Sequence, residues 1–209
     1  MTPPESLPST AVRAPGAHGA SASRTTTDVA LVATFAAFIA VAALLPSITV
    51  AGMAVPITLQ TFAVLLAGVV LGARRGALAV GLYLAVGLAG LPVFAQGTGG
   101  LAVVAGPSFG YLIAFPLAAA LAGYVATLAR RVRPGLRPAA LFGAAMTGSL
   151  VVIHPIGIAV MGWRLGLAPG AAIRLGATFL PGDVLKNLLV AVVAAAVFRA
   201  FPDMLRQRR

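Results

Sequence analysis

The sequence predicts an all-α membrane protein, a compact bundle of six transmembrane helices with both termini in the cytoplasm. Hydrophobic residues make up 60% of the 209 residues and charged residues only 9%, and the mean hydropathy is +1.01. Soluble domains are typically about 25% charged, so lipid must cover part of this surface. The basic residues stand in short clusters between the apolar runs, which is the arrangement that orients a membrane protein.

Each apolar run is close to the length of about 20 residues that one helical span needs. Proline marks the end of the first run and the start of the second, fifth and sixth, where it interrupts or opens a helix. Arginine clusters follow the second and fourth runs. The six predicted spans cover residues 29–45, 56–71, 76–91, 111–128, 138–161 and 183–200.

Both ends of the chain lack an apolar run. The first residues are rich in Pro, Ser, Ala and Thr, a composition typical of disorder, so residues 1–27 are expected to form a disordered cytoplasmic tail. Residues 28–201 are expected to form the six-helix membrane domain, and residues 202–209 a short basic cytoplasmic tail.

The positions of the basic residues predict the orientation. With the N-terminus inside, twelve of the fifteen basic residues fall on the cytoplasmic side, and only Arg164 and Arg174 fall in outer loops. This bias is the positive-inside pattern of a protein in the cytoplasmic membrane. A nucleic-acid partner is therefore not expected, although the Arg130 to Arg137 loop leaves open an interaction with nucleic acid or anionic lipid.

The three predicted outer loops carry no acidic residue and can converge over one cavity. They cover residues 46–55, 92–110 and 162–180, and the middle loop is long and rich in glycine. Glycine lets the backbone approach a ligand closely, although simple turn formation explains any single glycine equally well. The polar face of the bundle is thus expected to look outward.

Asp183 and Lys186 are the charged residues that the spans do not explain. They stand three residues apart at the outer end of the last span, a spacing that places them on one helix face. Charges within a span are costly and face a cavity or the bundle interior. One interpretation is that they only neutralise each other, or that Asp183 caps the helix. The other is that they recognise a polar solute.

Other polar residues have simpler explanations. Asp28 follows three threonines and is expected to cap the first span. Thr58 and Gln60, near the start of the second span, could line the cavity or hydrogen-bond between helices. His154 precedes Pro155, and a helix kink explains it better than a proton relay, whose only evident partners are Asp183 and Lys186.

The first span carries alanines at small-xxx-small spacings that let helices pack closely. They form a candidate packing surface for a partner helix and are Ala33, Ala36, Ala37 and Ala40.

Catalytic and metal-binding patterns are absent from the sequence. It has no cysteine, no HExxH motif, no paired carboxylates within a span, and no phosphate-binding loop followed by Lys-Ser or Lys-Thr. No metal, no cofactor and no enzymatic activity are therefore expected, and the chain cannot hydrolyse ATP itself. A solute-binding membrane protein is the better interpretation.

Five motifs stand along the predicted membrane domain: VPITLQT (55–61), LAGVVLGARRGA (66–77), GLPVF (90–94), GPSFGY (106–111) and PGDVLK (181–186). In this order they resemble the biotin transporter BioY family, the substrate-binding S components of energy-coupling-factor transporters. The resemblance extends from Asp28 to Ala200.

The resemblance implies a multi-pass S component that captures biotin with high affinity from outside the cell. It further implies a transmembrane coupling subunit and two cytoplasmic ATPase subunits as partners that supply the energy, although some members of the family work without them. The alanine surface of the first span would then contact the coupling subunit.

By motif position, the resemblance makes Asp183 and Lys186 biotin contacts. A carboxylate can accept from the ureido N–H groups and an ammonium can donate to the ureido carbonyl. The further candidate contacts on the ligand are Gln60, Phe94, Gln96, Thr98, Tyr111 and Arg174. Backbone N–H groups of Gln96 to Gly100, or else Arg174, are candidates for the valerate carboxylate. Phe94 and Tyr111 would pack on the thiophane ring, although Phe94 could equally belong to the core.

The sequence leaves three alternatives. The first is an S component for another small vitamin, and the second is a membrane-embedded enzyme that would depend on Asp183, Lys186 and His154. The third is an assembly subunit in which Asp183 and Lys186 merely pair and no solute binds.

Overall fold

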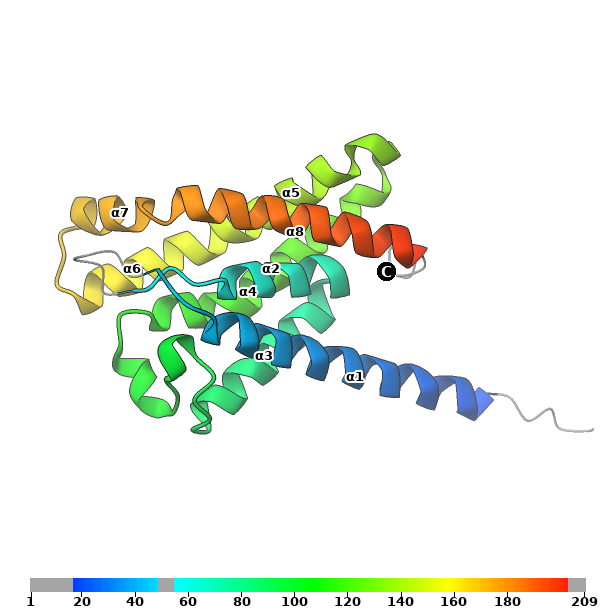
Figure 1. Cartoon of the computed structure of the whole chain (residues 1–209), viewed down its shortest axis with the longest axis horizontal. Helices are drawn as coiled ribbons and strands as arrows, with labels where there is room; N and C mark the ends of the chain where they lie inside the picture. Colours follow the sequence, from blue (N-terminus) through cyan, green and yellow to red (C-terminus); the bar gives the residue numbers. More distant parts are fainter. Residues whose placement is uncertain (1–16, 49–54, 203–209) are drawn as a thin grey trace, which may run out of the picture.

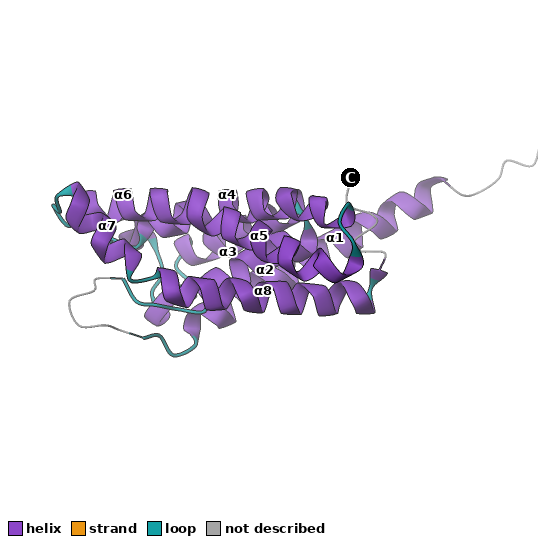
Figure 2. Ribbon diagram, turned by 90° about the horizontal axis from the view of Figure 1, so that it is seen from above, coloured by secondary structure: helices purple, strands orange, loops and turns teal. Residues whose placement is uncertain are grey.

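A computed structural model describes residues 17–48 and 55–202, and these residues form helices joined by short loops, with no β-strand among them (Figure 1). The α-helices are α1 (Ala17–Leu44), α2 (Gln60–Leu71), α3 (Ala73–Leu88), α4 (Phe109–Ala126), α5 (Arg137–Gly148), α6 (His154–Arg164), α7 (Pro169–Ala177) and α8 (Leu180–Ala200). The all-α prediction is confirmed for this part of the chain. The helices run roughly along the long axis of the molecule (Figure 2).

Helix α1 begins earlier than the sequence predicts. Residues 17–27 are helical rather than disordered, and residues 1–16 lie outside the described residues. The prediction that Asp28 caps the first span is also wrong, because Asp28 lies within α1 and its Oδ1 is 2.6 Å from Nη2 of Arg75 on α3. Hydropathy marks the membrane-embedded part of a helix and not its end, and the Ala-rich segment before Asp28 continues the helix.

Four helical segments are long and apolar enough to cross a membrane. They are Thr25–Leu44, Phe109–Ala129, Pro134–Arg164 and Leu180–Ala200. Helices α2 and α3 have 12 and 16 residues, which at about 1.5 Å per residue is shorter than the hydrocarbon core of about 30 Å. The predicted outer loop 162–180 contains α7, a helix that the sequence did not indicate.

The third long segment contains a π-helical turn. Residues Ser149–Ile153 form this turn between α5 and α6, and Pro155 follows it. Proline has no N–H to donate to the preceding helical turn, and π turns are frequent at functional sites. The turn places His154 in the bundle interior.

Helix α4 is the centre of the bundle and packs against α2, α3, α5 and α6. Its closest approach is made at glycines: a Cβ on Gly123 would overlap the backbone at Gly68 and Gly72, and a Cβ on Gly68 would overlap the backbone of Ala119. A Cβ on Gly76 of α3 would in turn overlap Gly68. Helices α2, α3 and α4 therefore meet backbone to backbone at these glycines.

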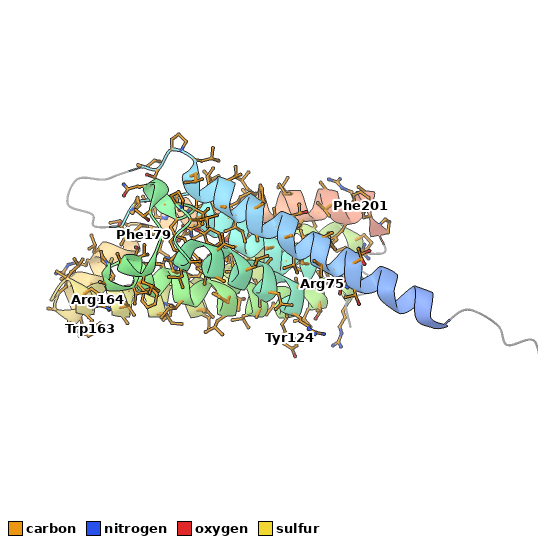
Figure 3. All side chains as sticks on the ribbon, turned by 90° about the horizontal axis from the view of Figure 1, so that it is seen from below. Arg75, Tyr124, Trp163, Arg164, Phe179 and Phe201 are labelled. Atoms are coloured by element: carbon orange, nitrogen blue, oxygen red, sulfur yellow. The ribbon has the colours of Figure 1, made fainter. Side chains whose placement is uncertain are left out.

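The side chains labelled in Figure 3 lie toward two opposite ends of the molecule. Arg75, Tyr124 and Phe201 lie toward one end, and Trp163, Arg164 and Phe179 lie toward the other (Figure 3). The N-terminal part of α1 extends beyond the bundle at the same end as the last described residues (Figure 1). The loops before α2, between α3 and α4 and between α6 and α7 lie at the opposite end, where the candidate site is found.

Candidate functional site

A cavity of about 150 Å³ opens between the first turns of α2, α4 and α8 and the loop that precedes α4. Helix starts bring polar groups to it, because the first N–H groups of a helix have no partner within the helix. Apolar and aromatic residues supply the rest of the wall. The lining residues are Val55, Pro56, Ile57, Thr58, Gln60, Thr61, Phe94, Ala95, Gln96, Thr98, Val103, Ser108, Tyr111, Leu112, Phe115, Ile153, Phe179, Asp183 and Lys186.

Asp183 and Lys186 form a buried ion pair in the cavity wall. Lys186 Nζ lies 2.7 Å from Asp183 Oδ1, and the two side chains are 9% and 8% exposed. The ammonium also donates to the carbonyl oxygen of Thr58 at 3.1 Å and to Oγ1 of Thr61 at 3.0 Å. An ammonium has three N–H donors, so all three are occupied. The pair therefore links the start of α8 to the start of α2.

The second carboxylate oxygen of Asp183 faces His154. Nε2 of His154 lies 3.3 Å from Asp183 Oδ2, but without the alignment of a hydrogen bond. The other ring nitrogen, Nδ1, lies 3.1 Å from the carbonyl oxygen of Ser149, across the π turn. A carbonyl can only accept, so Nδ1 carries a proton. Asp183 Oδ2 can thus still accept a hydrogen bond from a ligand in the cavity. His154 contacts this oxygen but is not itself a lining residue.

The side-chain amide of Gln60, in the cavity wall, is held by a buried tyrosine. Gln60 Nε2 donates to the Tyr83 hydroxyl at 2.8 Å, and that hydroxyl donates to the carbonyl oxygen of Val93 at 3.3 Å. Gln60 is 4% exposed and Tyr83 is 2% exposed. Tyr83 lies on α3, does not line the cavity, and so contacts the site only through its neighbours.

Two aromatic side chains that the sequence singled out line the cavity from different elements. Phe94 packs edge-on against Tyr83, with ring centroids 5.3 Å apart. Tyr111 packs against Phe179 at 5.7 Å, and its ring occupies the space that a Cβ on Gly157 would need. Phe94 thus belongs both to the core and to the cavity wall, so the two interpretations of this residue are compatible.

The glycine-rich loop contributes Gln96 and Thr98 to the cavity wall. Gln96 has a positive φ of 61°, a conformation that costs a non-glycine residue roughly 1–2 kcal/mol; here it belongs to the tight turn that pairs Phe94 with Thr98. The N–H groups of Gly97, Thr98 and Gly100 donate to backbone carbonyls. These three N–H groups are therefore occupied, and fewer candidates remain for an anion in this loop.

The remaining predicted residues lie outside the cavity wall. Arg174 is exposed on α7 and is not among the lining residues, so the structure does not bring it together with Asp183. On α1, Ala36 and Ala40 pack against the core of the bundle itself. Only Ala33 and Ala37 are exposed, and the proposed packing surface is reduced to these two alanines because the α1 face that contacts α2 and α3 includes the others.

Several cavity residues were missed from the sequence. Thr61 had a signal, since it stands beside Gln60 in the second predicted span, whereas Ser108, Phe115 and Phe179 had none that separates them from ordinary helix residues. His154 was noted but assigned to a kink. Within residues 17–48 and 55–202, no three His, Cys, Asp or Glu side chains are grouped as a metal site would require.

Comparisons with known proteins agree with this architecture. The BioY family matches residues 14–203. The biotin transporter BioY of Rhizobium etli is 41% identical over 179 residues, which is 85% of this chain and 96% of the relative. The biotin transporter BioY of Rhodobacter capsulatus is 40% identical over 192 residues, which is 87% of this chain and 98% of the relative.

A solved structure shares the fold. The crystal structure of the S-component for biotin from an ECF-type ABC transporter superposes with a TM-score of 0.75 at 26% identity, covering 85% of this chain and 93% of that one. A family match over nearly the whole chain and relatives of 40% identity point to the same group. The chain belongs to the BioY family.

Proposed function

We propose that this protein takes up biotin across the bacterial cytoplasmic membrane, binding it in the cavity at the start of α2, α4 and α8. The observation that carries the proposal is the buried Asp183–Lys186 pair in the wall of that cavity, in a chain whose full-length relatives are biotin transporters. The protein is a transporter component and not an enzyme.

The polar groups of the cavity suit the ureido ring of biotin. Asp183 Oδ2 has acceptor capacity for a ureido N–H, and a hydrogen bond to a charged group is worth about 1.5–3 kcal/mol. Lys186 can donate to the ureido carbonyl if it exchanges its bond to the Thr58 carbonyl oxygen. The two side chains are about 4.5 Å apart along the helix axis, so both act on the ring and neither reaches the far end of the ligand.

The valerate carboxylate is proposed to lie against the glycine-rich loop. Gln96 and Thr98 line the cavity there, and both carry side chains that can donate to a carboxylate. Arg174 is left out of the proposal because it is not part of the cavity wall. Phe94 and Tyr111 supply apolar surface for the thiophane ring between the two polar ends.

Six membrane crossings are proposed, with both termini in the cytoplasm and the cavity facing outward. Each of the four long helical segments is long enough to cross the membrane by itself. Helices α2 and α3 each make one crossing, and the loop segments beside the cavity complete the length that these shorter helices lack. The positions of Arg75 and Phe201 at the end away from the cavity (Figure 3) support this orientation, since arginine clusters favour the cytoplasmic side.

Transport is proposed to be energised by partners, namely a transmembrane coupling subunit and two cytoplasmic ATPase subunits. The support is the ECF-type transporter to which the similar S-component belongs. The exposed alanines Ala33 and Ala37 of α1 are the proposed contact with the coupling subunit, because small residues let two helices approach closely in a membrane.

Titration calorimetry with biotin in detergent tests the proposal, using the wild type and Asp183→Asn. Binding by the wild type and a loss of at least about tenfold in the variant are expected, since one charge-assisted hydrogen bond is removed. Val184→Ala, an exposed neighbour on α8, is the matched control and should bind as the wild type does. A folded wild type that does not bind biotin would overturn the assignment.

A further inference from the structure

We propose that Tyr83 is a positioning residue for ligand recognition, which fixes the amide of Gln60 so that its carbonyl oxygen faces the ligand. Tyr83 lies on α3, is 2% exposed and does not line the cavity, so it acts through Gln60 and not by direct contact. The inference deepens the proposed biotin site and rests on it.

The orientation of Gln60 follows from counting donors and acceptors. The carbonyl oxygen of Val93 can only accept, so the hydroxyl proton of Tyr83 is used for that bond, at 3.3 Å. The hydroxyl oxygen can then only accept from Gln60, which lies 2.8 Å away. The group of Gln60 that faces Tyr83 must therefore be the NH₂ end of its amide.

The other end of the amide is consequently an acceptor at the cavity. Gln60 Oε1 accepts no hydrogen bond within the described residues, and it is not one of the fully enclosed unpaired atoms there, so it is accessible from the cavity that Gln60 lines. A donor group of a ligand can therefore reach this carbonyl oxygen. By binding the NH₂ group of Gln60, Tyr83 thus directs Gln60 Oε1 toward a ligand in the cavity.

The cavity then presents a donor and acceptor pattern that matches a cyclic urea. Two acceptors, Gln60 Oε1 and Asp183 Oδ2, can accept from two N–H groups, while Lys186 can donate to one carbonyl oxygen in exchange for its bond to the Thr58 carbonyl oxygen. If Gln60 were turned over, its NH₂ group would oppose a ureido N–H and one recognition bond would be lost. Tyr83 is therefore a determinant of selectivity for ligands with two N–H donors.

Selectivity is the property to measure, because a merely structural tyrosine would not change it. The probes are biotin and the two biotins that carry a methyl group on one ureido nitrogen, each titrated by calorimetry against wild type, Tyr83→Phe and Gln60→Met. Tyr124→Phe is the matched control, since Tyr124 is 68% exposed on α4. The wild type should prefer biotin over both methylated forms.

In Tyr83→Phe the amide of Gln60 can rotate, so we expect biotin affinity to fall about three- to tenfold, the worth of one hydrogen bond. The preference over at least one methylated biotin should fall by a similar factor. In the Gln60→Met background, Tyr83→Phe should change neither quantity, because residues that act through one another are not additive. Tyr124→Phe should match the wild type throughout.

If folded Tyr83→Phe prefers biotin over both methylated biotins as strongly as the wild type does, the inference is overturned while the proposed function stands. If the wild type does not bind biotin, the proposed function itself is overturned. If Tyr83→Phe gives no cooperative unfolding transition, Gln60→Met alone decides. Loss of the preference for at least one probe supports Gln60 Oε1 as the acceptor, and a retained preference for both refutes it.

Discussion

Replacing the two members of the Asp183–Lys186 pair separately and together distinguishes a structural pair from a recognition pair. The single variants are Asp183→Asn and Lys186→Met, and the third variant combines them. Both side chains are less than 10% exposed, and their charged atoms are 2.7 Å apart. Removal of one partner from such a pair leaves an uncompensated buried charge and costs about 3–5 kcal/mol.

The stability of the double variant should partly recover. In a chain of 209 residues, 1 kcal/mol corresponds to about 2–4 °C in Tm, so each single variant should melt roughly 6–20 °C below the wild type. The double variant carries no unpaired charge, and replacing a buried pair by neutral groups is often close to neutral. We therefore expect it to melt above both single variants, measured by thermal unfolding in the same detergent.

Biotin binding should not recover with stability. The double variant lacks both charge-assisted hydrogen bonds to the ureido ring, worth about 1.5–3 kcal/mol each, so its affinity should fall at least about a hundredfold. Calorimetry on the folded double variant provides the measurement. Biotin binding within about threefold of wild type would refute the recognition role and leave the pair a purely structural contact.

Three further substitutions test neighbouring parts of the argument. Gly157→Ala should displace the Tyr111 ring, at a cost of about 1–3 kcal/mol for overpacking, and should lower both Tm and biotin affinity. Gly143→Ala is its control, because a Cβ there meets no atom within 4 Å, and it should lower neither quantity. Arg174→Ala should leave biotin affinity within about twofold of wild type by calorimetry; a larger loss would place the valerate elsewhere than proposed. Ala37→Leu should leave biotin binding intact but reduce the recovery of the coupling subunit in co-purification, and full recovery would exclude this alanine from the contact.

The sequence predicts well those features that local rules determine. Apolar runs with proline or arginine at their ends located the helices, and the three-residue spacing of Asp183 and Lys186 was enough to place both on one face of α8. The glycine-rich loop was identified as part of a ligand cavity because its length exceeded what a connection needs. The structure brings Gln96 and Thr98 of this loop to the same cavity as Asp183.

The features that the sequence did not predict depend on how helices face one another. The contact of His154 with Asp183 requires the π turn between α5 and α6, which rotates the helix surface, and no periodic pattern signals such a turn. The bond from Gln60 to Tyr83 joins residues 23 positions apart. Asp28 was predicted to cap the first span because it follows three threonines, and its ion pair with Arg75 of another helix has no signal in the sequence.

The glycine contact between α2, α3 and α4 has a consequence for natural and laboratory variation. A glycine codon becomes an alanine codon by one nucleotide change, yet at Gly68, Gly76 and Gly123 the added methyl group would meet backbone atoms that no side-chain rotation can move. In a library of all single variants selected for growth on scarce biotin, these three positions should tolerate no replacement. They lie in the half of the bundle away from the cavity, so their depletion would map the packing of the helices, whereas depletion at Gln60 or Asp183 would map the ligand.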